Sequence, residues 1–218
     1  ARAMALGEKY FGSCKDVENA LCINLGWGIG LGIIVNHQVY SGNHGFAGEF
    51  GHIVIDENGP LCHCGKRGCL EIMASGNAIS KKAKKALQEG QESMVMKMVH
   101  GDIDSVDTKL IVQAAKEGDL FSIEILEEIG NYIGKALAVL INIFSPEMIV
   151  IGGSVSLGGK FLLTPIQTSA RRMAYTPLVK DLKIVNSKLD HFAGALGATT
   201  LITRDIFETQ HLDLSPYI

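Results

Sequence analysis

Short apolar runs bounded by glycine or turn residues predict the strands of this chain. Residues 20–34 form an apolar run that glycines interrupt, which indicates one strand, a tight turn and a second strand. Residues 35–40 are expected to continue the second strand after a possible turn at Asn36 and His37. Further strands are predicted at 53–55, 148–151 and 182–186. Because these runs are short and separated by helical patterns, they favour a sheet that is assembled from distant parts of the chain.

Stretches with helical spacing of apolar residues lie between and beside these strands. Helices are predicted at residues 1–12, 70–89, 108–117, 120–144, 160–174 and 193–208. Asp119 is a suitable N-cap for the longest of them, which Ser145 and Pro146 end. The alternation of strands and helices predicts an α/β fold. The first helix begins without an initiator methionine or a capping side chain, so we expect the chain to be cut from a longer protein.

Composition and charge narrow the class of protein. Hydrophobic residues make up 47% and charged residues 20% of the 218 residues, which is typical of a folded globular domain. The net charge of −3 gives no electrostatic footprint for nucleic acid, so any DNA binding would reside outside this chain. No stretch reaches the ~18–20 apolar residues that span a bilayer, and no signal peptide is evident. We therefore expect a cytoplasmic protein that does not contact a membrane.

Potential zinc ligands crowd into one turn-rich segment. Three cysteines at 62, 64 and 69 follow His52, and two glycines at 65 and 68 let the chain fold back on itself. Structural zinc prefers four Cys or His ligands in a tetrahedron, so this spacing predicts a zinc site. The fourth ligand could be His52, His63 or His44. The alternative is a cluster of reduced structural thiols without a metal.

The segment at 48–75, GEFGHIVIDENGPLCHCGKRGCLEIMAS, resembles the signature of the ROK family of bacterial sugar kinases and sugar-responsive repressors. Its matching parts, GE-x-GH and C-x-CG-x2-GCLE, are long and specific. The resemblance implies the actin-like ATPase fold, which is ribonuclease H-like and hexokinase-type. Residues 1–218 would be its C-terminal lobe with a zinc loop at 48–75. The N-terminal lobe, the catalytic aspartate and any winged-helix domain would be absent from this chain.

The resemblance also implies roles for residues of this loop. The implied zinc ligands are His52, Cys62, Cys64 and Cys69. The implied sugar contacts are Glu49, His52 and Glu71. Such groups suit a hexose, because one carboxylate accepts two hydroxyl protons, and an imidazole bound to zinc through one nitrogen keeps the other for a hydrogen bond.

Two glycine segments resemble nucleotide-binding loops of the family's kinases. The positions concerned are Gly26, Gly28, Gly30, Gly152 and Gly153. The kinases usually carry threonine where this chain has Trp27, so a hydroxyl that would meet phosphate is replaced by a large ring. Ser154 departs only mildly from the family's pattern. We expect these loops to be vestigial in a regulator and functional in a kinase.

The resemblance leaves two functions, of which the sequence favours the regulator. Residues 9–13 and 114–144 are most similar to the NagC/XylR-type repressor branch. The chain would then be a sugar-sensing domain whose hexose ligand shifts the conformations of an absent DNA-binding domain. The alternative is the C-terminal part of an ATP- and Mg²⁺-dependent hexose kinase of the glucokinase or N-acetylhexosamine kinase type. A third hypothesis is a zinc module that binds another protein.

Other expectations concern positions outside the signature. This chain by itself should have no catalytic residue, since the base and the first phosphate loop would lie in the absent lobe. Cys14 and Cys22 are interpreted as structural, and the helix at 193–208 is expected to contact the absent lobe. The family commonly forms dimers or dimers of dimers, which implies a homodimer or homotetramer. Residues 210–218 have no periodicity and are expected to pack on the absent lobe or another subunit.

Overall fold

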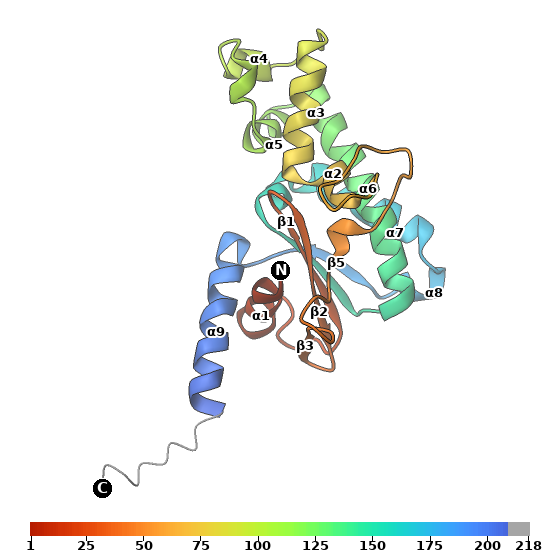
Figure 1. Cartoon of the computed structure of the whole chain (residues 1–218), viewed down its shortest axis with the longest axis vertical. Coiled ribbons are helices and arrows are strands. Elements are labelled where there is room, and N and C mark those ends of the chain that lie inside the picture. Colours follow the sequence, from red (N-terminus) through yellow and green to blue (C-terminus); the bar gives the residue numbers. More distant parts are fainter. Residues whose placement is uncertain (209–218) are drawn as a thin grey trace, which may run out of the picture.

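Five strands form one mixed sheet in the order β3-β2-β1-β4-β5 (Figure 1). The strands are β1 (Ala20–Leu25), β2 (Ile29–Val35), β3 (Gln38–Tyr40), β4 (Met148–Gly152) and β5 (Lys183–Asn186). Strands β1, β2 and β3 pair antiparallel in sequence order, whereas β4 runs parallel to β1 and β5 runs parallel to β4. The computed structural model describes the backbone of residues 1–208 and the side chains of residues 1–201.

Helices cover both faces of this sheet (Figure 1). They are α1 (Arg2–Phe11), α2 (Leu70–Ala74), α3 (Gly76–Gln88), α4 (Val95–Met98), α5 (Thr108–Lys116), α6 (Leu120–Phe144), α7 (Lys160–Met173), α8 (Thr176–Val179) and α9 (Ala193–Glu208). One face is covered by α1, which α9 packs against, and the other by α6 and its neighbour α7. Within residues 1–208 no helix has both the length and the apolar character to cross a membrane.

The alternation of side chains along β1 divides the interior into two cores. Leu21, Ile23 and Leu25 point into the larger core beneath α6, while Ala20 and Cys22 point into the smaller core beneath α1. Cys22 and Cys14 are both fully buried there, with their sulfur atoms 3.9 Å apart. This placement agrees with the structural role predicted for the two cysteines.

Two element predictions were wrong. Residues 53–55 form no strand, and Val54 makes only an isolated bridge with Cys69, because the loop that follows is too tightly folded to offer a longer partner. The helix predicted at 70–89 is interrupted at Ser75, which adopts an extended backbone and caps α3 by accepting a hydrogen bond from the Ala78 amide at 3.2 Å. The apolar spacing alone could not reveal this break, since both helices present apolar residues to the same core.

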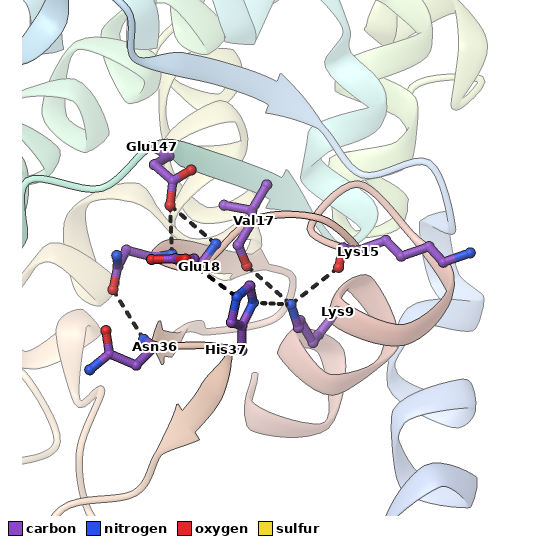
Figure 2. A network of polar contacts seen from close by, with 8 residues as sticks. Lys9, Lys15, Val17, Glu18, Asn36, His37 and Glu147 are labelled. Carbon is purple, nitrogen blue, oxygen red and sulfur yellow. Dashed lines mark hydrogen bonds and ion pairs between the residues drawn. The ribbon is translucent and has the colours of Figure 1, made fainter.

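A lysine fastens α1 to the neighbouring loops (Figure 2). The Lys9 ammonium donates to the carbonyls of Lys15 and Val17, at 3.2 and 3.1 Å, and to His37 Nδ1 at 2.8 Å. Because an ammonium has no acceptor, His37 must accept through Nδ1 and carry its proton on Nε2, which lies 3.6 Å from Glu18 Oε1. The contacts hold the turn between β2 and β3 against α1.

A glutamate joins the starts of the two central strands (Figure 2). Glu147, directly before β4, accepts hydrogen bonds from the amides of Glu18 and Asn19 at 3.1 and 2.9 Å. Asn19 in turn accepts the Asn36 amide at 3.1 Å. These bonds align β1 with β4, and the carboxyl ends of both parallel strands therefore meet at the opposite edge of the sheet.

Asp119 is the N-cap of α6, as predicted, and it also anchors the segment before α4. One of its oxygens accepts the Ser122 amide at 3.0 Å, and the other accepts the Met94 amide at 3.0 Å from the segment before α4. Burial raises the pKa of this carboxyl, but hydrogen bonds from Ser122, Met94 and Ser93 outweigh burial and leave the pKa lowered. The ionised form of Asp119 is therefore the one that the fold prefers.

Replacing Asp119 by alanine is expected to reduce the free energy of unfolding at pH 7 by about 2 kcal/mol, since a cap and a second anchor are both lost. Asp107→Ala is the matched control, because Asp107 caps α5 through the Leu110 amide alone. This substitution should cost about 1 kcal/mol or less.

The contribution of Asp119 to stability depends on pH, because its pKa is lower in the folded protein than in the unfolded chain. The Asp119 carboxylate therefore stabilises the fold fully above its unfolded pKa of about 3.9, and this stabilisation is lost as the pH falls through its folded pKa. Urea unfolding at several pH values measures both effects; equal losses for the two variants would contradict the second anchor.

Candidate metal centre and adjoining carboxylates

The loop between β3 and α2 folds back on itself through backbone hydrogen bonds. The Gly68 carbonyl accepts the Ile55 amide at 2.9 Å, and the Gly68 amide donates to Pro60 at 2.9 Å. Gly68 has φ +62°, and a Cβ there would lie closer than 3.0 Å to the Asp56 carbonyl. Only glycine fits this turn, which brings Cys69 back beside the earlier cysteines.

Four side chains converge where the loop closes. Their ligand atoms, Nδ1 or Nε2 of His52 and the sulfurs of Cys62, Cys64 and Cys69, all lie within 4.8 Å of one another. His52 Nδ1 is 3.7 Å from the Cys62 sulfur, and the sulfurs of Cys64 and Cys69 are 3.5 Å apart. Bonds of ~2.3 Å to sulfur and ~2.0 Å to nitrogen would separate tetrahedral ligands by about 3.5–3.8 Å. The spacing of this cluster therefore fits a zinc ion.

The structure distinguishes the three histidines that the sequence left open as fourth ligand. Among the described residues, His52 is the histidine grouped with the three thiols. His63 Nδ1 lies 3.8 Å from the Cys62 sulfur, but its side chain is 70% exposed and it groups instead with His52 and Glu71. His44 lies in the exposed loop before the site, where its Nε2 is 2.9 Å from the side-chain nitrogen Nδ2 of Asn43.

The thiols of the cluster differ in acidity. Burial raises the pKa of Cys69 to about 12, with hydrogen bonds to the neighbouring thiols adding to the effect. A backbone hydrogen bond at Lys66 lowers the pKa of the exposed Cys64. Since zinc binds thiolates, metal binding here would displace at least the Cys69 proton.

Glu71 joins the loop that carries the candidate metal ligands, residues 48–75, to the sheet. It lies in the first turn of α2, two residues after Cys69, and its side chain is 22% exposed. Its Oε2 accepts the Ile29 amide at 3.0 Å, while Oε1 lies 3.7 Å from His63 Nδ1. Nothing in the sequence pointed to the Ile29 amide as a partner, because the two residues are 42 positions apart.

The other predicted sugar contacts lie on the same loop. Glu49 is exposed and directly precedes a 3-10 turn that spans Phe50–His52. The His52 amide donates to the Glu49 carbonyl at 3.1 Å and so closes a tight turn between the two residues. The structure thus brings His52, His63 and Glu71 together and places Glu49 at the start of the turn that carries His52. His63 was not among the predicted sugar contacts.

The two glycine segments meet at one edge of the sheet. The turn containing Gly26 and Gly28 follows β1, and Gly153 follows β4, which runs parallel to β1. A Cβ at Gly153 would lie closer than 3.0 Å to the Leu25 carbonyl, so the two segments are in direct contact. Trp27, at the tip of the turn, is 81% exposed.

Two of the predicted loop glycines lie inside strands. Gly30 is in β2, paired with Asn24, and a Cβ there would press on the Ala1 side chain. Gly152 is the last residue of β4, where a Cβ would collide with the end of Met4. Both glycines therefore allow α1 to approach the sheet closely.

Comparison with known proteins places this site in a family. The model of the ROK family matches residues 1–205. The DNA-binding transcriptional dual regulator NagC of Escherichia coli K12 is 36% identical over 214 residues, which are 97% of this chain and 51% of NagC. The glucokinase of Thermotoga maritima is 35% identical over 206 residues, 94% of this chain and 65% of the enzyme. A solved glucokinase from Streptomyces griseus, in complex with glucose and AMPPNP, has a TM-score of 0.86 and 35% identity and covers 92% of this chain and 65% of the enzyme.

The chain belongs to the ROK family and has the actin-like ATPase fold, as its signature predicted. It spans about half the length of the curated regulator and about two thirds of the glucokinases. The relatives include both transcriptional repressors and sugar kinases at similar identity. Membership of the family is thus compatible with either function.

Proposed function

We propose that this chain is the sugar-binding C-terminal lobe of a cytoplasmic ROK-family transcriptional regulator. Its ligand is a hexose or hexose derivative, which Glu49, His52 and Glu71 contact. A structural zinc ion is held by His52, Cys62, Cys64 and Cys69. The observation that carries this proposal is the convergence of the four ligand atoms within 4.8 Å of one another, next to the group that His52 forms with His63 and Glu71.

The metal would act by fixing the direction of an imidazole. His52 Nδ1 faces the Cys62 sulfur at 3.7 Å, so coordination through Nδ1 leaves Nε2 to hydrogen-bond a sugar hydroxyl. Glu71 is fixed independently by the Ile29 amide, and its second oxygen is free of the backbone. Such fixed groups favour a polyhydroxy ligand, because a buried polar group that is left unmatched costs roughly 1–3 kcal/mol.

Trp27 favours the regulator over the kinase. Its ring is 81% exposed at the turn after β1, where the kinases of the family present a hydroxyl to phosphate. A large apolar ring at this position removes a donor and occupies the approach of a phosphate oxygen. DNA binding would belong to an N-terminal domain beyond this chain, and the sugar would change the balance between its conformations. The whole regulator would be a homodimer or homotetramer.

A kinase that uses ATP and Mg²⁺ is the second candidate. The observation in its favour is that Gly28 and Gly153 lie at the same edge of the sheet, as two nucleotide loops would. This chain would then supply the sugar contacts and the second phosphate loop, and the absent lobe would supply the base.

Two measurements on the full-length protein separate these functions. Calorimetric titration with glucose, N-acetylglucosamine and their 6-phosphates should detect binding of at least one of them. Glu71→Gln should weaken that binding by about tenfold or more, since a charged hydrogen-bond acceptor is lost. If the zinc-loaded protein binds none of these sugars, the result would favour a zinc module for protein binding.

A coupled assay with ATP, Mg²⁺ and the same sugars should show no turnover. Turnover near the ~1–100 s⁻¹ typical of kinases would reject the regulator.

A further inference from the structure

The glycine turn that resembles a phosphate loop is in direct contact with the sugar-site carboxylate. A Cβ at Gly28 would lie closer than 3.0 Å to Glu71 Oε2, the oxygen that accepts the Ile29 amide at 3.0 Å. Gly26, two residues earlier in the same turn, has no atom within 4 Å of its Cβ position. The two glycines therefore differ in what they permit, although both belong to the same motif.

The φ angle of Gly28 does not by itself require glycine. It lies outside the left-handed region that favours glycine over other residues. The turn is held by the Gly26 amide bonded to the Gly28 carbonyl at 3.0 Å and by the Gly76 amide bonded to the Gly26 carbonyl at 2.8 Å. Since the turn is fixed at both places, an added methyl group would displace the carboxylate rather than the backbone.

Gly51 also lies next to Glu71. A Cβ at Gly51 would lie 3.2 Å from Glu71 Cβ and 3.3 Å from Oε2. The base of α2 is fixed as well, because the Leu70 amide donates to the Ile53 carbonyl at 2.8 Å. The carboxylate thus reaches the Ile29 amide where Gly28 and Gly51 both lack a side chain.

We propose that Gly28 is a positioning residue of the sugar site: its missing side chain lets Glu71 reach the Ile29 amide and so fixes the carboxylate toward the ligand. This inference rests on the proposed function, in which Glu71 contacts the sugar. It assigns the glycine turn a role that requires no phosphate or nucleotide. A regulator without ATP would still need Gly28, whereas Gly26 would be dispensable.

The test compares Gly28→Ala with Gly26→Ala in the full-length protein. Titration with glucose and N-acetylglucosamine should show affinity reduced about tenfold or more by Gly28→Ala, because the carboxylate loses its position, and changed less than about twofold by Gly26→Ala. Zinc content measured by elemental analysis should be the same in both variants and the wild type. Equal sugar affinities for the two variants would overturn the inference.

A double-mutant cycle shows whether Gly28 acts through Glu71. In a Glu71→Ala background the further change Gly28→Ala should have no effect on sugar affinity, since the group that it displaces is already gone. Losses that simply add would mean that Gly28 supports the site in another way and would overturn the positioning role.

Hydrogen exchange of the free protein tests the same contact without a ligand. The Ile29 amide should be protected in the wild type and in Gly26→Ala, and should exchange faster in Gly28→Ala and Glu71→Ala. If the wild type binds no hexose, the proposed function fails while exchange still decides whether Gly28 positions Glu71. An Ile29 amide that exchanges equally in all four proteins would overturn the inference whatever the ligand.

Discussion

Replacing Cys69 by serine is expected to lower bound zinc from about one ion per chain to less than about a tenth of that. Cys69 is fully buried, and a serine hydroxyl is a poor ligand for zinc compared with a thiolate. Because metal binding and folding of such a loop are coupled, the loss should also loosen residues 48–75 and weaken sugar binding. Elemental analysis measures the first effect, and hydrogen exchange across the loop measures the second.

Cys14→Ala is the matched control for the metal centre. Cys14 is also a fully buried free thiol, but it lies in the small core beneath α1, next to Cys22. Its removal should cost stability through the cavity it leaves and should leave the zinc content unchanged. A Cys69→Ser protein that kept its zinc, or a wild type in which elemental analysis found no zinc, would contradict the metal centre.

Gly197→Ala is expected to lower the free energy of unfolding by about 3 kcal/mol, through overpacking where α9 crosses α1. A Cβ at Gly197 would lie closer than 3.0 Å to the Ala3 carbonyl, and one at Gly7 would also lie closer than 3.0 Å to the Ala193 carbonyl. Both helices thus approach through backbone atoms that have no room for a methyl group. Urea denaturation monitored by circular dichroism provides the measurement.

Gly194→Ala distinguishes this close approach from a general effect on the helix. Gly194 lies one turn earlier in α9 and has no atom within 4 Å of its Cβ position. Alanine there should stabilise the protein by up to about 1 kcal/mol, because alanine has the higher helix propensity. Similar changes for Gly194→Ala and Gly197→Ala would contradict the packing of α9 on α1 that the structure shows.

The helix α9 was predicted from the sequence, whereas the expectation for residues 210–218 stays untested. The helix predicted at 193–208 is present with those bounds, and within this chain it packs on α1. Its predicted contact with an absent lobe stays a prediction. Residues 210–218 lie outside the described part of the chain.

Glu8 is a structural feature that the apolar spacing did not predict. It is fully buried in α1 and accepts hydrogen bonds from the Ser13 amide and the Ser187 hydroxyl.

Local patterns were sufficient for features that depend on neighbouring residues. The strand, turn and strand at 20–34, the capped helix beginning at Leu120 and the α/β class follow from periodicity and capping, which act over a few positions. Residues 38–40 form a separate strand, β3, which turns back antiparallel to β2. The types of the candidate zinc ligands are equally local, since three thiols within eight residues need little beyond a tight turn to meet. The signature at 48–75 then indicated the family, which the comparisons show.

The sequence by itself therefore determined the fold class and the family, and it placed the candidate zinc ligands in one loop. Only the tertiary structure decided that His52 faces the thiols, that Glu71 bonds to the Ile29 amide across 42 positions, and that Gly28 and Gly197 mark close contacts. The physical reason is that these contacts join segments whose relative placement is set by the packing of the whole core. A glycine in the sequence can indicate that another group packs closely against the backbone, but it does not identify that group.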